Sequence, residues 1–332
     1  MIAIGASTGA VSALRSLVAD LPADLPAAVL VVTHTGAHPS VMPVLLESQG
    51  PLPARHALHG EPIVPGRIYV APPDHHMLVE GDRLELSRGP KEHYTRPSID
   101  PLFRSVALSH GAKVIGVVLT GNLDDGTAGL QAIKTMGGTA VVQDPDDAEA
   151  PSMPRSALRH VKADHCVRLS KMGSLLATLA ARTGTDEQVD DTTSNPDRQR
   201  LADEQRASKG NAMEQLQAIA QPSPFSCPDC GGGLWEVKQA DPPRYRCHTG
   251  HAFSLLSLNA AQAVATEEAL RSAIRALKEK EALLQRLAET DLAAGDAASA
   301  KTMAEGALQA QRQAAVLQQL VEEEEPLFLN PA

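Results

Sequence analysis

The strongest constraint on the fold is a regular alternation of short apolar runs and amphipathic stretches over residues 1–182. The runs Ile2–Ile4, Ala27–Thr33 and Lys113–Leu119 have the length and β-branched content of buried strands, whereas Ala10–Ala19 has helical spacing. Continuous apolar strands between amphipathic helices are typical of a mostly parallel sheet with helices on both faces. We therefore predict a doubly wound α/β domain here.

Further segments continue this alternation. We expect helices at Pro39–Gln49, Ser98–His110, Gly126–Met136 and Lys171–Ala181, and strands at Thr139–Gln143 and Asp164–Leu169. The segments Arg67–Ala71 and Arg83–Leu86 flank the turn Glu80-Gly-Asp, and we expect them to form a hairpin.

The second half of the chain changes character. Residues 183–224 are rich in Thr, Asp, Glu, Gln, Arg and Ser with little apolar periodicity, which predicts a solvated linker. Residues 225–253 contain three of the four cysteines and predict a small metal-binding module.

Residues 254–326 are rich in helix formers, and Gly295 is expected to divide them into a helical hairpin. One helical stripe consists of Leu270, Ile274, Leu277 and Leu284. Such a stripe is typical of a short coiled-coil seam. An interaction or self-association element and a plain solvated hairpin both fit this pattern.

Composition excludes several classes of partner. The formal net charge is −10 and no long Lys/Arg cluster is present, so we expect binding neither to nucleic acid nor to an anionic membrane surface. No signal peptide begins at Met1, and no apolar run approaches the roughly 20 residues of a membrane span. Cysteines clustered near histidines suit a reducing compartment. We expect a cytoplasmic protein without membrane insertion.

The first candidate reactive group is Ser7, in the turn Gly5-Ala-Ser-Thr-Gly9 between a strand and a helix. Such a turn presents a hydroxyl and helix N–H groups at the carboxyl edge of a parallel sheet, which suits acyl transfer. Taken alone, a Gly-rich turn after a first strand more often binds phosphate.

Two further groups follow strand ends. His34 comes directly after the run Ala27–Thr33, where it would act as a base if it lies near Ser7. The stretch Leu119–Gly126 contains Asp124 and Asp125, and a carboxylate there would orient the imidazole. A polar strand cap and an ordinary helix start are the alternatives for these two features.

These residues carry a resemblance to the catalytic domain of chemotaxis protein-glutamate methylesterases. The matching segments occur in order over residues 1 to about 180: Ile4-Gly-Ala-Ser-Thr-Gly, the strand ending in His34, Pro65–Leu78, Arg96–Phe103, Leu119–Gly126 and Met153-Pro-Arg. The resemblance implies a serine esterase that removes methyl groups from glutamate methyl esters on chemoreceptor cytoplasmic helices, with deamidation of receptor glutamines in some members.

The resemblance also assigns roles to residues. It implies Ser7 as nucleophile, His34 as general base and acid, and Asp125 rather than Asp124 as the orienting carboxylate, because the family aspartate directly precedes the glycine. It implies the backbone N–H groups of Thr8 and Asn122 as the oxyanion hole. No metal is expected in the ester hydrolysis itself.

Some features depart from the family pattern. Members usually carry a phospho-accepting receiver domain before the esterase, and only six residues precede Ser7 here, so we expect no such domain and no control by it. Ala10 replaces a common glycine, and Asn122 replaces the usual methionine. The pair His75-His76 has no assigned role.

The cysteine module predicts a zinc site. Cys227 and Cys230 form a Cys-x-x-Cys knuckle followed by glycines, and Cys247-His-Thr-Gly-His251 follows. We expect a structural Zn²⁺ bound by these three cysteines and His251, because adjacent His248 would be strained. A redox Cys-x-x-Cys pair is the alternative.

Three functions are compatible with these sequence features. The first is the methylesterase, with a methylated chemoreceptor or related signalling protein as partner. The second is a catalytically weak adaptor that binds a chemosensory partner through the zinc and helical regions. The third is a nucleotide-binding protein, which the absence of a P-loop lysine disfavours.

Overall fold

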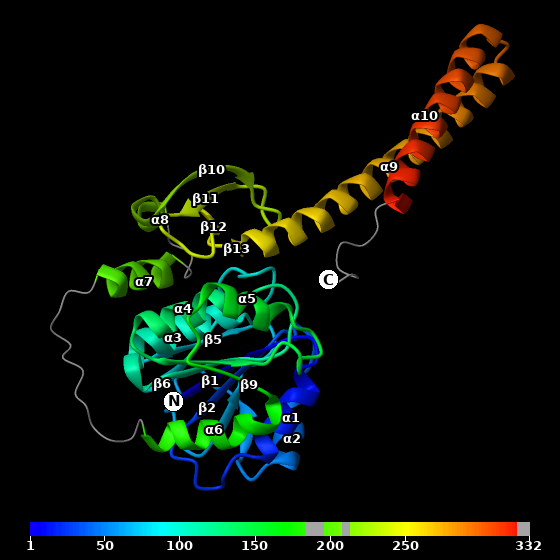
Figure 1. Ribbon diagram of the computed structural model, residues 1–332. Helices are drawn as coiled ribbons and strands as arrows, with labels where there is room; N and C mark the ends of the chain where they lie inside the picture. The colour runs from blue at the N-terminus through cyan, green and yellow to red at the C-terminus, as the bar shows by residue number, and fades with distance from the viewer. Residues whose placement is uncertain (183–195, 208–212, 324–332) are drawn as a thin grey trace. The chain divides into compact units, whose positions relative to one another are not determined.

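The computed structural model describes residues 1–182, 196–207 and 213–323 (Figure 1). The chain divides into two compact units, Met1–Leu258 and Asn259–Ala332. Within the described ranges, no helix combines the length and the apolar character that a membrane span requires.

The first unit contains a seven-stranded sheet of order β3-β4-β2-β1-β7-β8-β9, and every neighbouring pair is parallel. The strands are β1 (Ile2–Ala6), β2 (Val29–Thr33), β3 (Ala54–His56), β4 (Ile68–Val70), β7 (Ile115–Val118), β8 (Thr139–Gln143) and β9 (His165–Val167). The central strands β1, β2 and β7 are fully buried, as their continuous apolar runs predict.

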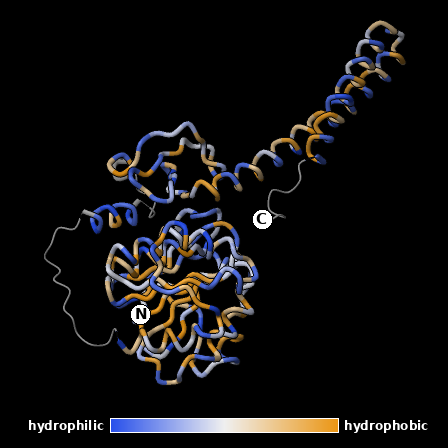
Figure 2. The backbone as a smooth tube through the Cα atoms, viewed as in Figure 1, coloured by the Kyte–Doolittle hydropathy of each residue, from blue (hydrophilic) through white to orange (hydrophobic). Residues whose placement is uncertain are grey.

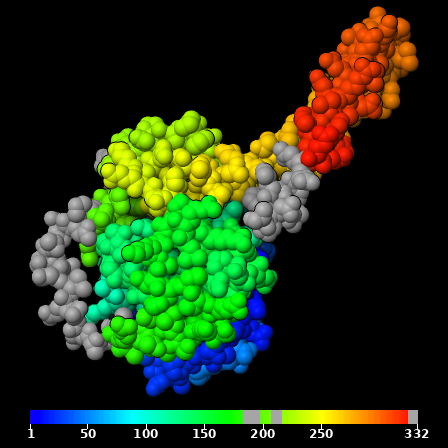
Figure 3. All heavy atoms as spheres, viewed as in Figure 1, coloured from blue at the N-terminus to red at the C-terminus, as the bar shows by residue number. Residues whose placement is uncertain are grey.

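Helices cover both faces of this sheet (Figure 1). One face packs against α1 (Ala10–Ala19), α2 (Met42–Gln49) and α6 (Leu169–Arg182). The other packs against α3 (Ile99–His110), α4 (Thr127–Thr135) and α5 (Ser152–His160), with a short 3₁₀ turn at Gly111–Lys113. Figure 2 shows hydrophobic residues along the strands in the middle of the α/β domain, and Figure 3 shows that other atoms cover these strands at the surface. The α/β prediction is confirmed.

The expected hairpin is wrong in one of its two strands. The partner of β6 (Arg83–Ser87) is β5 (His76–Glu80), whereas Ile68–Val70 joins the parallel sheet between β3 and β2. Val79 and Leu84 face each other across the turn at Gly81 and are both buried, so their packing fixes the register. The apolar run of β4 belongs to the central sheet because it is buried on both faces.

The segment 183–224, expected as a linker, contains regular structure in its described part. Helices α7 (Pro196–Ala207) and α8 (Met213–Ile219) lie there, and a four-stranded antiparallel sheet follows. Its strands are β10 (Ala220–Ser226), β11 (Gly233–Val237), β12 (Arg244–Cys247) and β13 (Ala252–Ser254). We call residues 220–254 the Cys module. Leu201 of α7 is buried against the α/β core, which explains why this polar helix is ordered.

The second unit is a helical hairpin, as expected from Gly295. Helix α9 (Leu255–Ala293) begins in the first unit, and α10 (Ala297–Glu323) follows the turn, where Gly295 has a φ of 83°. Gly306 of α10 lies against Leu284 of the predicted stripe, and the stripe is half-buried.

Candidate active site and metal cluster

Ser7 lies in the turn between β1 and α1, at the carboxyl edge of the sheet. Its backbone N–H donates to the Thr120 carbonyl at 2.9 Å, which ties the turn to the end of β7. Gly9 has a φ of 79° at the N-terminus of α1, a conformation that favours glycine. The turn is therefore held in a shape that presents the Ser7 hydroxyl above the strand ends.

His34 reaches Ser7 because β1 and β2 are neighbours in the sheet. Ala6 pairs with Thr33, so the residues that follow each strand lie side by side. The Nδ1 atom of His34 lies 3.0 Å from Ser7 Oγ, and its Nε2 lies 2.7 Å from Asp125 Oδ2. In the Nε2–H tautomer, the imidazole donates to the carboxylate and accepts the serine proton.

Asp125 is buried, and several donors surround its carboxylate. The N–H groups of Ile99 and Asp100, at the start of α3, donate to it at 2.7 and 3.1 Å, and the Ser98 hydroxyl donates at 2.9 Å. Although burial alone would raise its pKa, His93 and the hydrogen bond from His34 hold the pKa of Asp125 well below its usual range. A carboxylate that is ionised at neutral pH and accepts the Nε2–H of His34 fixes the imidazole tautomer.

The Asp124 side chain contacts Ser254. Its Oδ1 accepts a hydrogen bond from Ser254 Oγ at 2.7 Å, and burial raises its pKa. The sequence-based choice of Asp125 over Asp124 therefore agrees with which carboxylate lies next to His34.

The two residues expected as the oxyanion hole are neighbours in space. Asn122 Nδ2 donates to Thr8 Oγ1 at 3.1 Å, and Thr120 Oγ1 donates to the Thr8 carbonyl at 2.9 Å. A Cβ on Gly121 would lie 2.9 Å from Ser7 Cβ, so a side chain there would press on the serine. The close approach of the two loops depends on this glycine.

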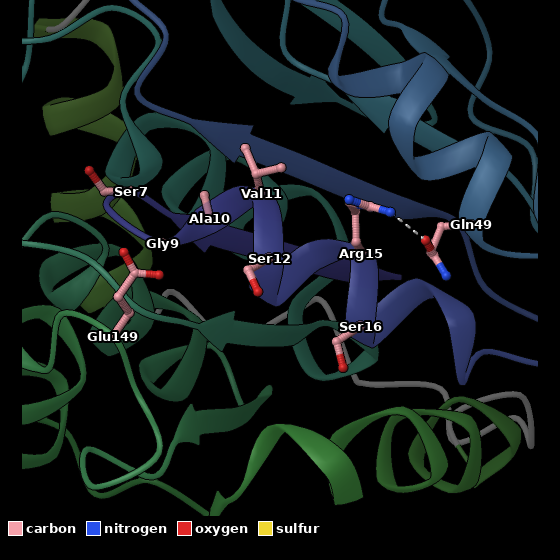
Figure 4. Close-up of a pocket in the computed structure, with 9 residues that line it drawn as sticks. All are labelled: Ser7, Gly9, Ala10, Val11, Ser12, Arg15, Ser16, Gln49 and Glu149. Atoms are coloured by element: carbon pink, nitrogen blue, oxygen red, sulfur yellow. Dashed lines mark hydrogen bonds between the residues drawn. The ribbon is translucent and has the colours of Figure 1, made fainter.

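A groove of about 590 Å³ begins at Ser7 and follows α1 (Figure 4). Ser7 and Glu149 lie at one end, and Arg15 and Gln49, which form a hydrogen bond of 2.9 Å, lie at the other. Six of its nine lining residues are polar or charged.

Sequence reasoning missed His93, which lies beside the Asp125 carboxylate. Its Nε2 donates to Asp100 Oδ2 at 2.7 Å and lies 3.7 Å from Asp125 Oδ1. Burial would lower its pKa, but the carboxylates of Asp125, Asp100 and Asp124 raise it to about 10. The side chain is therefore an imidazolium at neutral pH. The segment carrying it forms no regular element, so no strand or helix signal marks it.

Of the pair His75-His76, His76 connects the Pro90 backbone to the Ser98 backbone. Its Nε2 donates to the Pro90 carbonyl at 2.9 Å and its Nδ1 accepts from the Ser98 N–H at 3.3 Å. Burial lowers its pKa, which favours the neutral ring that these two contacts require. His75 lies outside this network and its Nδ1 contacts the Pro73 carbonyl.

The Cys module gathers four candidate metal ligands, Cys227, Cys230, Cys247 and His251, whose ligand atoms all lie within 4.8 Å of one another. The Sγ atoms of Cys230 and Cys247 are 3.7 Å apart, and His251 Nδ1 lies 3.5 Å from Cys247 Sγ. His248 instead packs over Gly232 and is exposed. The fourth cysteine, Cys166, lies on β9, outside this cluster.

A parallel α/β sheet with a hydroxyl, an imidazole and a carboxylate in a row at its carboxyl edge defines a hydrolase-type site. Comparison with known proteins narrows this class. The chain belongs to the CheB methylesterase family, whose sequence profile matches residues 2–176.

Individual relatives agree with this assignment. A putative protein-glutamate methylesterase/protein-glutamine glutaminase of Leptospira interrogans is 38% identical over 180 residues, which cover 54% of this chain and 93% of that protein. A Caulobacter vibrioides protein-glutamate methylesterase/protein-glutamine glutaminase is 37% identical over 54% of this chain and 53% of its own length. The crystal structure of the Thermotoga maritima CheB methylesterase catalytic domain matches with a TM-score of 0.52 and 30% identity, covering 54% of this chain and 97% of that one.

Proposed function

We propose that this protein is a cytoplasmic serine esterase that hydrolyses glutamate methyl esters on the cytoplasmic regions of chemoreceptors, in sensory adaptation. The observation that carries the proposal is the row Asp125–His34–Ser7, with heavy-atom distances of 2.7 and 3.0 Å. The names of the relatives support both esterase and glutaminase activity, so receptor glutamines are a second substrate class.

Each catalytic residue has one task in the proposed reaction. His34 Nδ1 accepts the Ser7 proton while Oγ attacks the side-chain ester carbonyl, and the resulting imidazolium then protonates the methoxide leaving group. Methanol departs and leaves an acyl-enzyme on Ser7. Water, deprotonated by His34, attacks this acyl group and releases glutamate and the free serine.

Charge developing on the carbonyl oxygen needs donors near Ser7. The backbone N–H groups of Thr8 and Asn122 are the candidates, because their loops are joined by the Asn122 to Thr8 hydrogen bond of 3.1 Å. Preorganised donors of this kind contribute about 3 kcal/mol each to lowering the barrier. The same arrangement serves an amide carbonyl, with ammonia as the leaving group.

The groove along α1 suits a receptor helix. Arg15, at the end of the groove far from Ser7, offers a cation to acidic receptor side chains, whereas the Glu149 carboxylate lies at the Ser7 end. A carboxylate there disfavours the anionic glutamate product relative to the neutral ester. The groove therefore favours binding of the ester and release of the product.

We further propose that the Cys module binds one structural Zn²⁺ through Cys227, Cys230, Cys247 and His251. A tetrahedral zinc site places sulfur atoms about 3.8 Å apart and sulfur and nitrogen about 3.5 Å apart. The observed separations of 3.7, 3.5 and 3.6 Å support this assignment. With four protein ligands the metal would stabilise the fold and supply no reactive position.

The test of the esterase proposal is release of radiolabelled methanol from methylated receptor cytoplasmic fragments by the wild-type chain and by Ser7→Ala. We expect release by the wild type and its loss, by at least about 10³-fold, in the variant. Ser12→Ala is the matched control, because Ser12 lies in the first turn of α1 and lines the same groove. Release that persists in Ser7→Ala would exclude the proposed nucleophile, and failure of the wild type across several fragments would favour the adaptor function.

A further inference from the structure

The segment Lys91–His93 lies between the Cys module and the catalytic carboxylate. The Ala252 N–H donates to the Lys91 carbonyl at 3.2 Å, and the His93 N–H donates to the Ala252 carbonyl at 2.8 Å. The backbone of β13 therefore pairs with this segment as a neighbouring strand would. These contacts fix the main chain that carries the His93 imidazole.

A buried charge network strengthens the same junction. Glu92 accepts hydrogen bonds from Arg104 of α3 and Arg246 of β12, each at 2.8 Å, and all three side chains are nearly inaccessible to solvent. Glu204 of α7 lies 3.6 Å from both guanidinium groups. Buried charges are tolerated only with partners in place, so the junction is highly specific in its geometry.

A third contact reaches the residue next to the catalytic aspartate. Ser254, at the end of β13, donates from its hydroxyl to Asp124 Oδ1 at 2.7 Å. The Cys module thus contacts two neighbours of Asp125: His93, through Ala252, and Asp124, through Ser254.

The His93 side chain links these contacts to the surroundings of Asp125. Its imidazole is enclosed by Asp100, Asp124 and Asp125, with nitrogen to oxygen distances of 2.7, 3.8 and 3.7 Å. It lies near Oδ1 of Asp125, whereas His34 contacts Oδ2. A fixed cation at Oδ1 holds the carboxylate ionised and in one orientation.

We propose that the Cys module is a clamp on the catalytic aspartate, in which the zinc-ordered strands β12 and β13 hold Glu92 and His93, and His93 acts as a positioning residue for Asp125. This inference rests on the triad and zinc site proposed above. Few apolar side chains support the module: Ala220 and Trp235 pack with Leu216 and Ile219 of α8, and Leu234, Val237, Tyr245 and Phe253 are buried within its sheet. A sheet of this size relies on its metal to keep its shape.

The test uses the full chain and the variant Cys230→Ser, with Cys166→Ser as the matched control. Bound zinc is measured together with kcat and KM for p-nitrophenyl acetate, a small ester that needs no receptor contacts. We expect Cys230→Ser to lose zinc and to lose about 10- to 100-fold in kcat with KM little changed, because a catalytic group is misplaced rather than removed. Cys166→Ser keeps zinc and wild-type rates. Loss of zinc without loss of kcat would overturn the clamp.

A second measurement separates the clamp from the esterase proposal. Hydrogen exchange of the His93 amide, bonded to Ala252, and the Ile99 amide, bonded to Asp125, reports the coupling without any substrate. We expect both amides to exchange faster in Cys230→Ser while strand β1 stays protected. Unchanged protection of both amides would refute the clamp even if the enzyme is active, and accelerated exchange in an inactive protein would refute only the esterase proposal.

A third variant addresses the case in which Cys230→Ser does not fold. His93→Gln keeps a hydrogen-bond donor of similar reach and leaves the zinc ligands intact. We expect it to bind zinc as the wild type does, while kcat falls by a factor similar to that of Cys230→Ser and KM changes little. A zinc-loaded His93→Gln enzyme with wild-type kcat would overturn the role assigned to His93.

Discussion

Asp124 and Asp125 are adjacent in the chain, and both are buried, but only Asp125 contacts His34. We predict that Asp125→Asn lowers kcat by about 10⁴-fold, because an amide stabilises the wrong imidazole tautomer and cannot stabilise the imidazolium. Asp124→Asn keeps an oxygen for the Ser254 hydroxyl, and we expect a loss of less than about 10-fold. Both rates are measured on the same ester at saturating concentration, and equal losses in the two variants would contradict the assignment.

His93 makes a prediction about stability and pH. Its pKa is raised from 6.5 to about 10, so the folded state binds its proton more tightly than the unfolded state does. Its contribution is therefore complete below pH 6.5 and is lost as the pH rises toward 10. We predict that the free energy of unfolding in urea falls across this window with a slope approaching about 1.4 kcal/mol per pH unit. His93→Gln serves as the comparison, and a variant with the wild-type slope would show that another group is responsible.

The same residues show where sequence reasoning succeeds. Ser7, His34 and Asp125 follow β1, β2 and β7, which are neighbours in one parallel sheet, so their proximity follows from the strand order of the fold. His93 lies outside any strand end. Its place beside Asp125 depends on the pairing of Lys91–His93 with Ala252, more than 150 residues later in the chain. Local sequence patterns carry no signal for such a contact.

At the scale of elements, the errors have a common physical origin. The sequence places Arg67–Ala71 in a hairpin because it and Arg83–Leu86 flank the turn Glu80-Gly-Asp, but burial on both faces places β4 in the central sheet. The polar sequence of α7 predicts a linker, yet Leu201 and Glu204 are buried against neighbouring parts of the first unit. In both segments a tertiary contact outweighs the local pattern.

The junction between β12 and Glu92 gives a prediction at this scale. Arg246→Met removes one of the two guanidinium partners at 2.8 Å and leaves the Glu92 carboxylate buried with Arg104 alone. We expect a loss of about 3–5 kcal/mol in the free energy of unfolding. The matched control is Lys134→Met, which breaks the more exposed pair with Asp164 and should cost no more than about 1 kcal/mol.

The double variant Glu92→Gln with Arg246→Met sharpens this comparison. Removal of the carboxylate charge together with the guanidinium leaves less uncompensated charge at the junction, so we expect the double variant to be more stable than Arg246→Met. Stabilities that simply add would indicate that Glu92 and Arg246 do not interact, and would remove the charge network from the clamp.

At the scale of the whole molecule, the residues of the proposed sites belong to one of the two compact units. The proposed triad, the groove, the candidate metal cluster and the proposed clamp all lie within Met1–Leu258, and the described residues of the α9–α10 hairpin supply none of their side chains. Unit 1 has its own apolar core on both sides of the sheet. A compact unit with its own core is expected to fold without the rest of the chain.

We therefore predict that a chain ending at Leu258 binds one zinc and hydrolyses p-nitrophenyl acetate with a kcat within about twofold of the full chain. A chain ending at Arg182 retains the triad but lacks Ala252, Arg246 and Ser254, so Asp125 loses the contacts that fix His93 and Asp124. Its kcat should be lower by about 10- to 100-fold, with intact secondary structure by circular dichroism checked in parallel. Equal activity of the two shortened chains would mean that the α/β domain positions Asp125 by itself.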